Sequence, residues 1–292
     1  MTAVVERAGI AEPGVYPDVP HADYIADPVP GGSLSSSGAK RLLPPSCPAL
    51  YRWWADHAEP PSDVFDFGTA AHRLVLGVGP EITPVFARDW RTKAAQARRE
   101  EIRAAGEVPL LDSDFSRVQA MATALRLHPV ACALFDPQVG QPEQTLIWRD
   151  ADTAVMRRAR LDWLPATQPG RRLLVGDYKT TTCAEPTEFE RSAWKYGYFG
   201  QAAWYLDAVR ALGLGDDDAQ FVWVAQEKDP PYLVSITYAD PIALRWAADR
   251  NRQALEIFAE CQATGEWPGY PSDPTPLALP GWVERRYLED YR

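Results

Sequence analysis

LLVGDYKTTT, residues 173 to 182, joins an apolar run to an acid, a base and three threonines. In an extended strand, side chains two positions apart point to the same face, so Asp177 and Lys179 share one face and Tyr178 takes the other. Such a pair is most often a surface ion pair. At the end of a buried strand it also suits a metal-binding centre, and the surrounding sequence has to separate these two interpretations.

Two further apolar and aromatic runs precede this stretch. They are QTLIWRD, residues 144–150, and AVMRRARLDWLPA, residues 154–166. Their β-branched and aromatic residues favour strands, and the turn-forming residues between the runs favour hairpins. The first break is short, and the second, PATQPG, is a longer hairpin loop. The sequence therefore predicts a three-stranded antiparallel meander whose third strand carries Asp177 and Lys179.

Helical patterns flank the predicted meander. Helices are expected from Gly38 until Pro44, and at about 49–57, 68–76, 90–105, 112–127, 186–212 and 241–264. Two more strands are expected at about 219–226 and 232–238. This order predicts an α/β (α+β) fold, with a central mixed sheet flanked by helices and a helical N-terminal addition.

The domain organisation follows from composition. Residues 1–32 are rich in Pro, Gly and Asp and predict an extended or flexible lead-in. Residues 33–292 predict a single domain, divided into a helical part 33–140, a core 141–265 and a loop-like tail 266–292. A chain of 292 residues is long enough to bury a substantial core.

Charge and cysteine usage narrow the functional classes. The net charge of −10 argues against a protein that coats nucleic acid non-specifically. No apolar run approaches the roughly 20 residues of a membrane span, and the N-terminus lacks the apolar region of a signal peptide. The four cysteines form no CxxC pair, which favours free thiols. We therefore expect a cytoplasmic protein that does not bind a membrane.

Positive charge is nevertheless concentrated in two places. Residues 88–103 hold six basic and three acidic residues, and a second cluster contains Arg157, Arg158 and Arg160. A solvated face and a face turned toward DNA both fit these clusters, and the sequence leaves the two open.

A second carboxylate strengthens the case for metal. Asp162, in LDWL, lies on the strand before Asp177, and the hairpin between them can bring both to one end of the sheet. Two close carboxylates repel each other, and a hard cation such as Mg²⁺ or Mn²⁺ removes this conflict because it binds oxygen ligands. Lys179, on the same face as Asp177, is placed to orient a water or to stabilise negative charge on a phosphate.

The ordered set of motifs resembles the PD-(D/E)XK nuclease superfamily, and within it the RecB/RecE-like, exodeoxyribonuclease VIII-like exonucleases. These proteins carry G-x-x-x-H on a helix, Asp on the second core strand, (D/E)-x-K on the third and Q-x-x-x-Y on the next helix. The matching residues here are His72 in GTAAH, Asp162 in LDWL, Asp177 and Lys179 in DYK, and Gln201 and Tyr205 in QAAWY. LSSSGAKRLLPPSCPALYRWW, from Leu34, is also similar to the start of phage-type RecE-like proteins. Asp177 departs from the Glu of many members, which changes the metal distance and not the chemistry.

The resemblance implies a role for each residue. Asp162, Asp177, Lys179, Gln201 and Tyr205 are the expected catalytic residues, and His72, Asp162, Asp177 and Glu143 the expected ligands of Mg²⁺ or Mn²⁺. Gln201 and Tyr205 share one helix face because they are four residues apart. A lone histidine on an amphipathic helix is more often a core residue, and only the motif order favours His72 as a ligand. Expected DNA contacts are Arg157, Arg158, Arg160, Thr180 and Thr181, although the two threonines also suit a cap at the strand end.

The function implied by this resemblance is a metal-dependent exonuclease. It would degrade duplex DNA from its ends, 5′ to 3′, to make single strands for recombination. The resemblance also implies a single-strand annealing recombinase as partner, a ring-like homo-oligomer and, for a phage-encoded protein, the cytoplasm of the bacterial host. No G-x-x-x-x-G-K-[ST] loop is present, so the sequence contains no ATPase motif of its own.

Two alternatives remain open at this point. An iron–sulfur exonuclease of the type found in CRISPR adaptation shares these motifs, but it needs a tight C-terminal cysteine group, and Cys261 stands alone there. A non-catalytic DNA-binding module with the same fold would not need Asp162, Asp177 and Lys179 together, and all three are present.

Overall fold

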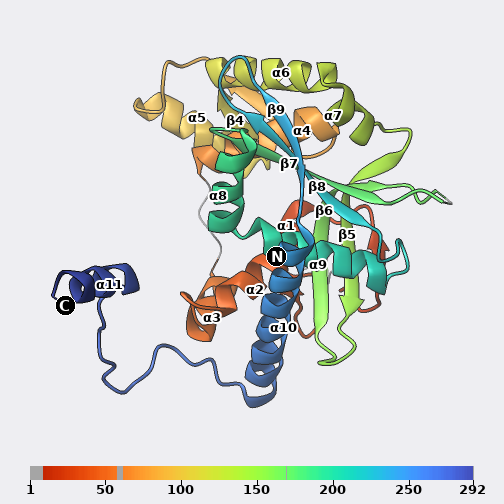
Figure 1. Ribbon diagram of the computed structural model, residues 1–292. Coiled ribbons are helices and arrows are strands. Elements are labelled where there is room, and N and C mark those ends of the chain that lie inside the picture. Colours follow the sequence, from red (N-terminus) through yellow and green to blue (C-terminus); the bar gives the residue numbers. More distant parts are fainter. Residues whose placement is uncertain (1–8, 58–61, 169, 292) are drawn as a thin grey trace, which may run out of the picture.

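The computed structural model describes residues 9–57, 62–168 and 170–291. Its centre is a mixed seven-stranded sheet with the strand order β1-β5-β6-β7-β8-β9, in which β2 also pairs with β6 (Figure 1). The strands of this sheet are β1 Gly14–Tyr16, β2 Leu34–Ser35, β5 Gly140–Arg149, β6 Met156–Pro165, β7 Leu174–Thr181, β8 Gln220–Glu227 and β9 Val234–Tyr238. A separate two-stranded parallel sheet contains β3 Ile82–Val85 and β4 Val108–Leu111.

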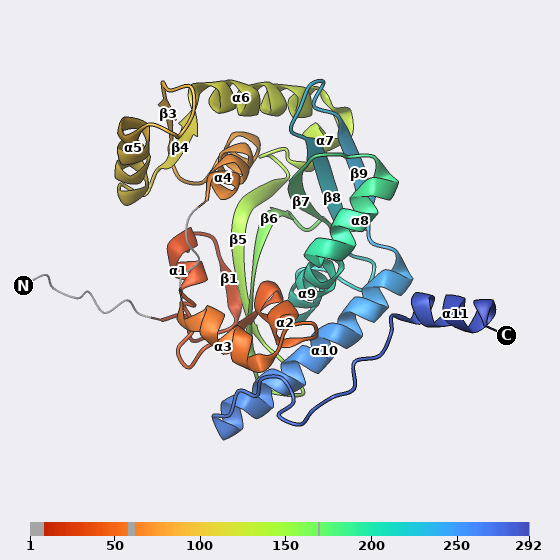
Figure 2. The same cartoon turned by 90° about the vertical axis from the view of Figure 1, so that its left-hand side faces the viewer.

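Helices cover both faces of the central sheet (Figure 2). They are α1 His21–Ile25, α2 Ser36–Leu42, α3 Pro48–Asp56, α4 Asp63–Leu76, α5 Lys93–Ala104, α6 Asp112–Leu127, α7 Pro129–Leu134, α8 Pro186–Tyr196, α9 Tyr198–Ala211, α10 Pro241–Thr264 and α11 Gly281–Asp290. One core cluster lies between the sheet and α2, α9 and α10, and the other between the sheet and α4 and α6. The mixed sheet flanked by helices confirms the predicted fold class.

The antiparallel meander of β5, β6 and β7 agrees with the sequence prediction. Strand β8 then pairs in parallel with β7, in register from Leu174 opposite Gln220 to Thr181 opposite Glu227. A parallel pair needs a crossover connection, which α8 and α9 provide. Tyr178 is fully buried on the α4 and α6 side, opposite to the face of Asp177, as the alternation of side chains predicts.

The single helix predicted over 186–212 is wrong. Gly197 has a φ of 78°, a left-handed conformation that ends α8 and lets the chain restart as α9. Glycine adopts this conformation without the steric cost of a Cβ atom, which explains why the break falls at this residue. The helical periodicity on both sides hides the break in the sequence.

The N-terminal residues differ from the extended or flexible lead-in expected over 1–32. Strand β1 pairs with β5, from Gly14 opposite Ile147 to Tyr16 opposite Thr145. Asp27 then forms an ion pair with the buried Arg158 at 2.8 Å. A buried guanidinium needs an acceptor, and Asp27 satisfies it, so this part of the chain packs onto the sheet. Residues 1–8 lie outside the described residues.

Other short elements also differ from the sequence prediction. Strands β3 and β4 add a small sheet to the helical part, and α7 follows α6 directly. Each is only four to six residues long, too short for periodicity to reveal. The tail, expected to be loop-like over 266–292, contains α11, which lies apart from the rest of the chain (Figure 1).

Candidate metal centre

Strands β6 and β7 separate where the candidate residues lie. Their ladder consists of one pair, Trp163 opposite Gly176. One step further, Asp162 lies opposite Asp177, but the backbone N–H of Tyr178 donates to Oδ2 of Asp162 at 2.9 Å. The carboxylate of Asp162 therefore takes the place of a backbone acceptor. We call this place, where Asp162 of β6 faces Asp177 and Tyr178 of β7, the strand fork.

Three side chains from different elements converge at this fork. His72 of α4, Glu143 of β5 and Asp162 of β6 each offer a ligand atom, and these atoms all lie within 4.8 Å of one another. Nδ1 of His72 is 3.5 Å from Oδ2 of Asp162, and its ring packs edge-on against Tyr178 at 5.1 Å between centroids. The structure thus brings together three of the four ligands expected from the sequence.

Glu143 reaches this group through local backbone geometry. The pairs on either side of it in the β5–β6 ladder, including Gln144 opposite Leu161, place it across from Asp162. Its φ of 54° is left-handed, which costs a non-glycine residue roughly 1–2 kcal/mol. Arg160 hydrogen-bonds the Glu143 carboxylate and donates a second bond to the carbonyl of Val19 at 2.7 Å. Arg160 therefore positions Glu143 and connects it to the N-terminal segment.

Asp177, the fourth expected ligand, lies outside this three-residue group. Its side chain is only 1% exposed, and Oδ2 is 2.6 Å from Nζ of Lys179. The side-chain amide of Gln201 donates to Oδ1 at 2.9 Å, and the buried Tyr205 lies one turn further along the same helix. The predicted motif residues of β7 and α9 are therefore in contact, with Asp177 between Lys179 and Gln201.

Burial and charge shift the pKa values of these groups in different directions. Burial raises the pKa of Asp162 and Asp177 to about 6, although the Lys179 charge opposes this for both. Burial and the Lys179 charge lower the pKa of His72 to about 4. Burial also lowers the pKa of Lys179, but the neighbouring Asp177 and Asp162 outweigh it and raise the value to about 12. At neutral pH the site therefore holds a neutral imidazole, an ammonium and carboxylates that a cation would keep ionised.

The donor set fits a divalent cation. His72, Glu143 and Asp162 supply one imidazole nitrogen and two carboxylates, which suit Mg²⁺ or Mn²⁺ better than a soft metal. Burial penalises the ionised carboxylate of Asp162, and a bound cation removes this penalty. No cysteine belongs to a metal-capable group among the described residues, so nothing there favours the iron–sulfur alternative.

Two of the expected DNA contacts need correction. Arg157 is 2% exposed and contacts Asp150 and Asp207, while its guanidinium lies between the rings of Trp148 and Trp204. Arg158 is also buried, bonded to the Ser33 carbonyl and paired with Asp27. Both side chains are structural because their charges are already compensated inside the protein, so we no longer assign them to DNA.

The two threonines expected to contact DNA lie at the end of β7. The hydroxyl of Thr181 donates to the carbonyl of Cys183 at 3.0 Å, which caps the strand end. Thr180 is half-buried and, by alternation, lies on the opposite face to Lys179. In the basic run 88–103, Arg99 and Arg103 form ion pairs with Asp63, which joins α5 to α4. These interactions favour a structural role for Thr181, Arg99 and Arg103.

Sequence reasoning missed two features of this centre. Tyr198 lies beside Lys179, with 5.0 Å between Nζ and the ring centroid, and it follows the unpredicted break at Gly197. Arg160 is only 15% exposed and hydrogen-bonds the Glu143 carboxylate. The spacing of Glu143 and Arg160 across the first hairpin was the only signal that could have revealed their pairing.

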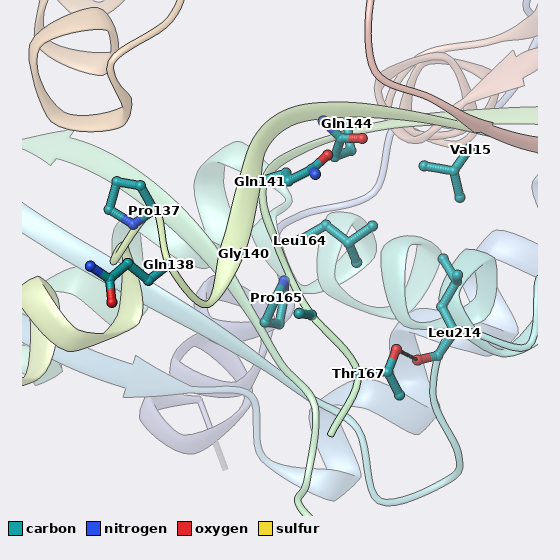
Figure 3. Close-up of a pocket in the computed structure, with 11 residues that line it drawn as sticks. Val15, Pro137, Gln138, Gly140, Gln141, Gln144, Leu164, Pro165, Thr167 and Leu214 are labelled. Atoms are coloured by element: carbon teal, nitrogen blue, oxygen red, sulfur yellow. Dashed lines mark hydrogen bonds between the residues drawn. The ribbon is translucent and has the colours of Figure 1, made fainter. Parts of the chain in front are cut away.

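A separate hollow of about 430 Å³ lies between the start of β5 and the end of β6 (Figure 3). Val15, Gln141 and Leu164 are among its lining residues, and Thr167 hydrogen-bonds the carbonyl of Leu214 at its edge. None of its lining residues is titratable. The hollow offers no acid, base or metal ligand, and we place the candidate site at the strand fork.

We expect Mn²⁺ to raise the melting temperature of the protein and to do so much less for Asp162→Asn. A ligand at 100 times its Kd stabilises the folded state by about 2.7 kcal/mol. The substitution keeps an oxygen for the Tyr178 N–H and removes the charge that a cation needs. Because protonated Asp162 cannot act as a ligand, the effect of Mn²⁺ should increase as pH rises through about 6. Differential scanning fluorimetry measures this, with Asp152→Asn, an exposed acid, as control. An equal Mn²⁺ effect in Asp162→Asn would contradict the assignment.

Among the described residues, no helix is long and apolar enough to cross a membrane.

Comparison with known proteins agrees with the fold. The model of a family described as "PDDEXK-like domain of unknown function" (DUF3799) matches residues 35–273. A crystal structure of a presumed exonuclease from Eubacterium rectale is 12% identical, with a TM-score of 0.56, over 85% of this chain and 91% of that one. The structure of an alkaline exonuclease from Laribacter hongkongensis matches 69% of this chain and 97% of its own, at 14% sequence identity. Its TM-score is 0.25, and the match carries no argument about function. No curated protein matches.

Proposed function

The chain belongs to the PDDEXK-like family whose model covers most of its length, and from this premise we propose that it is a metal-dependent DNA exonuclease. The observation that carries the proposal is the convergence of His72, Glu143 and Asp162 within 4.8 Å, next to the buried Asp177–Lys179 pair. A structural ion pair alone would not need a second cluster of acidic and imidazole ligands beside it. The Eubacterium rectale protein, which has a similar fold and is presumed to be an exonuclease, supports the same class of reaction.

The residues of the chain have distinct roles in this proposal. His72, Glu143 and Asp162 would hold the cation, with Asp177 beside them. A divalent cation at such a site lowers the pKa of a water and offsets charge on the scissile phosphate. Lys179 supplies a permanent positive charge to the phosphate, because its raised pKa keeps it protonated at neutral pH.

The polar residues of α9 hold this arrangement in place. Gln201 fixes the carboxylate of Asp177 through its hydrogen bond to Oδ1. Tyr205 stays protonated, because burial raises its pKa well above the usual range even though Gln201 opposes the shift. The phenol of Tyr205 therefore remains a neutral hydrogen-bond donor, one helical turn from Gln201.

The substrate is proposed to be the end of duplex DNA, degraded to leave single strands for recombination. With Mg²⁺ and without ATP, we expect the protein to degrade linear duplex and to leave closed circular duplex intact. Substrates labelled at the 5′ or at the 3′ end distinguish the polarity, and 5′-to-3′ degradation is expected. Cleavage of the circle would contradict the exonuclease part, and intact linear DNA at saturating Mg²⁺ and Mn²⁺ would contradict the nuclease. The single-strand annealing partner and the ring-like homo-oligomer stay predictions.

A further inference from the structure

Two tyrosines extend from the candidate site to the surface at the turn between α8 and α9. The ring of Tyr198 lies 5.0 Å from Nζ of Lys179. The ring of Tyr196 stacks on Tyr198, with 5.8 Å between centroids and 26° between planes. Tyr196 is 54% exposed, although an aromatic side chain of this size usually buries most of its surface. The pair thus offers an open aromatic face close to Lys179.

The turn that carries this pair is fixed from two sides. Nζ of Lys40, on α2, donates to the carbonyl of Lys195 at 3.2 Å. The Lys40 side chain also lies against Gly197, where an added Cβ would come within 2.9 Å of its Cδ atom. Tyr198 packs on Phe189 of α8 with 6.0 Å between the ring centroids. The tyrosines are therefore held in place before any ligand arrives.

Positive charge lies beside the exposed ring. Nζ of Lys195 lies 5.4 Å from the centroid of the Tyr196 ring. Within the described part of the chain, neither Lys195 nor Lys40 forms an ion pair with a carboxylate. Two uncompensated ammonium groups beside a stacked aromatic pair match a ligand that combines flat rings with negative charge.

We propose that Tyr196 and Tyr198 form a stacking platform for a single DNA strand that passes between the surface and the candidate site. A base of the strand stacks on the exposed face of Tyr196, and Lys40 and Lys195 contact its phosphates. Bases within a duplex already stack on one another, so the platform selects an unpaired strand. This inference rests on the proposed function, since it names the form of the substrate next to Lys179.

Binding of a labelled oligothymidylate, followed by fluorescence anisotropy in EDTA, tests the platform without cleavage. Stacking of one base contributes about 1–3 kcal/mol, so Tyr196→Ala should weaken binding roughly 5- to 150-fold. Tyr196→Trp should retain the affinity, because it keeps an aromatic face. Tyr238→Ala removes another exposed tyrosine, on β9, and should leave binding unchanged. Since Tyr196 is exposed, its replacement should not unfold the protein, which a melting curve verifies.

An abasic strand of the same length separates stacking from charge. It should bind the unmodified protein more weakly than oligothymidylate does, and Tyr196→Ala should not weaken it further. Equal binding of oligothymidylate by Tyr196→Ala and the unmodified protein would overturn the platform, as would an equal loss for both strands. If Tyr196→Ala behaves as expected but linear duplex is not degraded, the proposed nuclease fails and the strand-binding surface stands. The reverse result rejects only the platform.

Discussion

Asp177→Asn is expected to lower the rate of duplex degradation by at least roughly 10³-fold while the protein stays folded. The substitution removes the negative charge that lies 2.6 Å from Nζ of Lys179. An amide nitrogen in that position would point a donor at an ammonium group, so Lys179 loses its partner and its orientation. Gln201 still finds an oxygen on the asparagine, which limits the structural disturbance. Initial rates on end-labelled linear duplex with Mg²⁺ measure the effect.

The matched control for this experiment is Glu188→Gln. It also neutralises one carboxylate that contacts a cation, but the pair it forms with Arg191 is exposed on α8. Its activity should equal that of the unmodified protein. Lys179→Met, which removes the other half of the buried pair, should resemble Asp177→Asn. Normal digestion by a folded Asp177→Asn protein would remove Asp177 from the catalytic group and leave the fold as the only support for a nuclease.

The strands of the core could be predicted from sequence because their signals are local. Apolar runs separated by turn residues indicated the β5–β6–β7 meander, and the hairpin between Asp162 and Asp177 placed both at one end of the sheet. The fork could not be predicted. Only the structure reveals that β6 and β7 pair at one position, Trp163 opposite Gly176, and that the Tyr178 N–H donates to the Asp162 carboxylate. A side chain that replaces a backbone acceptor leaves no trace in periodicity.

Long-range contacts account for most of the remaining differences. The sequence predicts a basic patch at Arg157 and Arg158. In the fold, Arg157 pairs with Asp150 and Asp207, and Arg158 pairs with Asp27, and these distant partners cannot be identified from sequence alone. The break at Gly197 was hidden because a single glycine inside a helical pattern is often tolerated. Directly after this break, Tyr198 lies beside Lys179.

Asp150→Asn is expected to lower the free energy of unfolding by about 3–5 kcal/mol, a loss typical of one partner removed from a buried ion pair. Asp150 is 3% exposed and accepts from Arg252 at 2.7 and 3.1 Å and from Arg157 at 3.3 Å. Arg157 lies against two tryptophan rings and is 2% exposed. Its charge would remain buried with Asp207 as its only carboxylate partner among the described residues, and the melting temperature should fall by roughly 10 °C.

The pH dependence of stability gives a second measure of the same cluster. Burial alone would raise the pKa of Asp150, but hydrogen bonds from Arg252 and Thr153 outweigh it and lower the value to about 2. A carboxylate with a lowered pKa stabilises the folded state above its unfolded value of 3.8, and this contribution is lost as pH falls from there toward 2. Asp150→Asn should therefore lose less stability than the unmodified protein over this interval.

Asp207→Asn also removes a carboxylate from Arg157, but from a half-exposed position, so denaturant unfolding should detect a smaller loss of stability than in Asp150→Asn. Equal losses in the two variants would contradict the central role of Asp150, because burial is the property that distinguishes them.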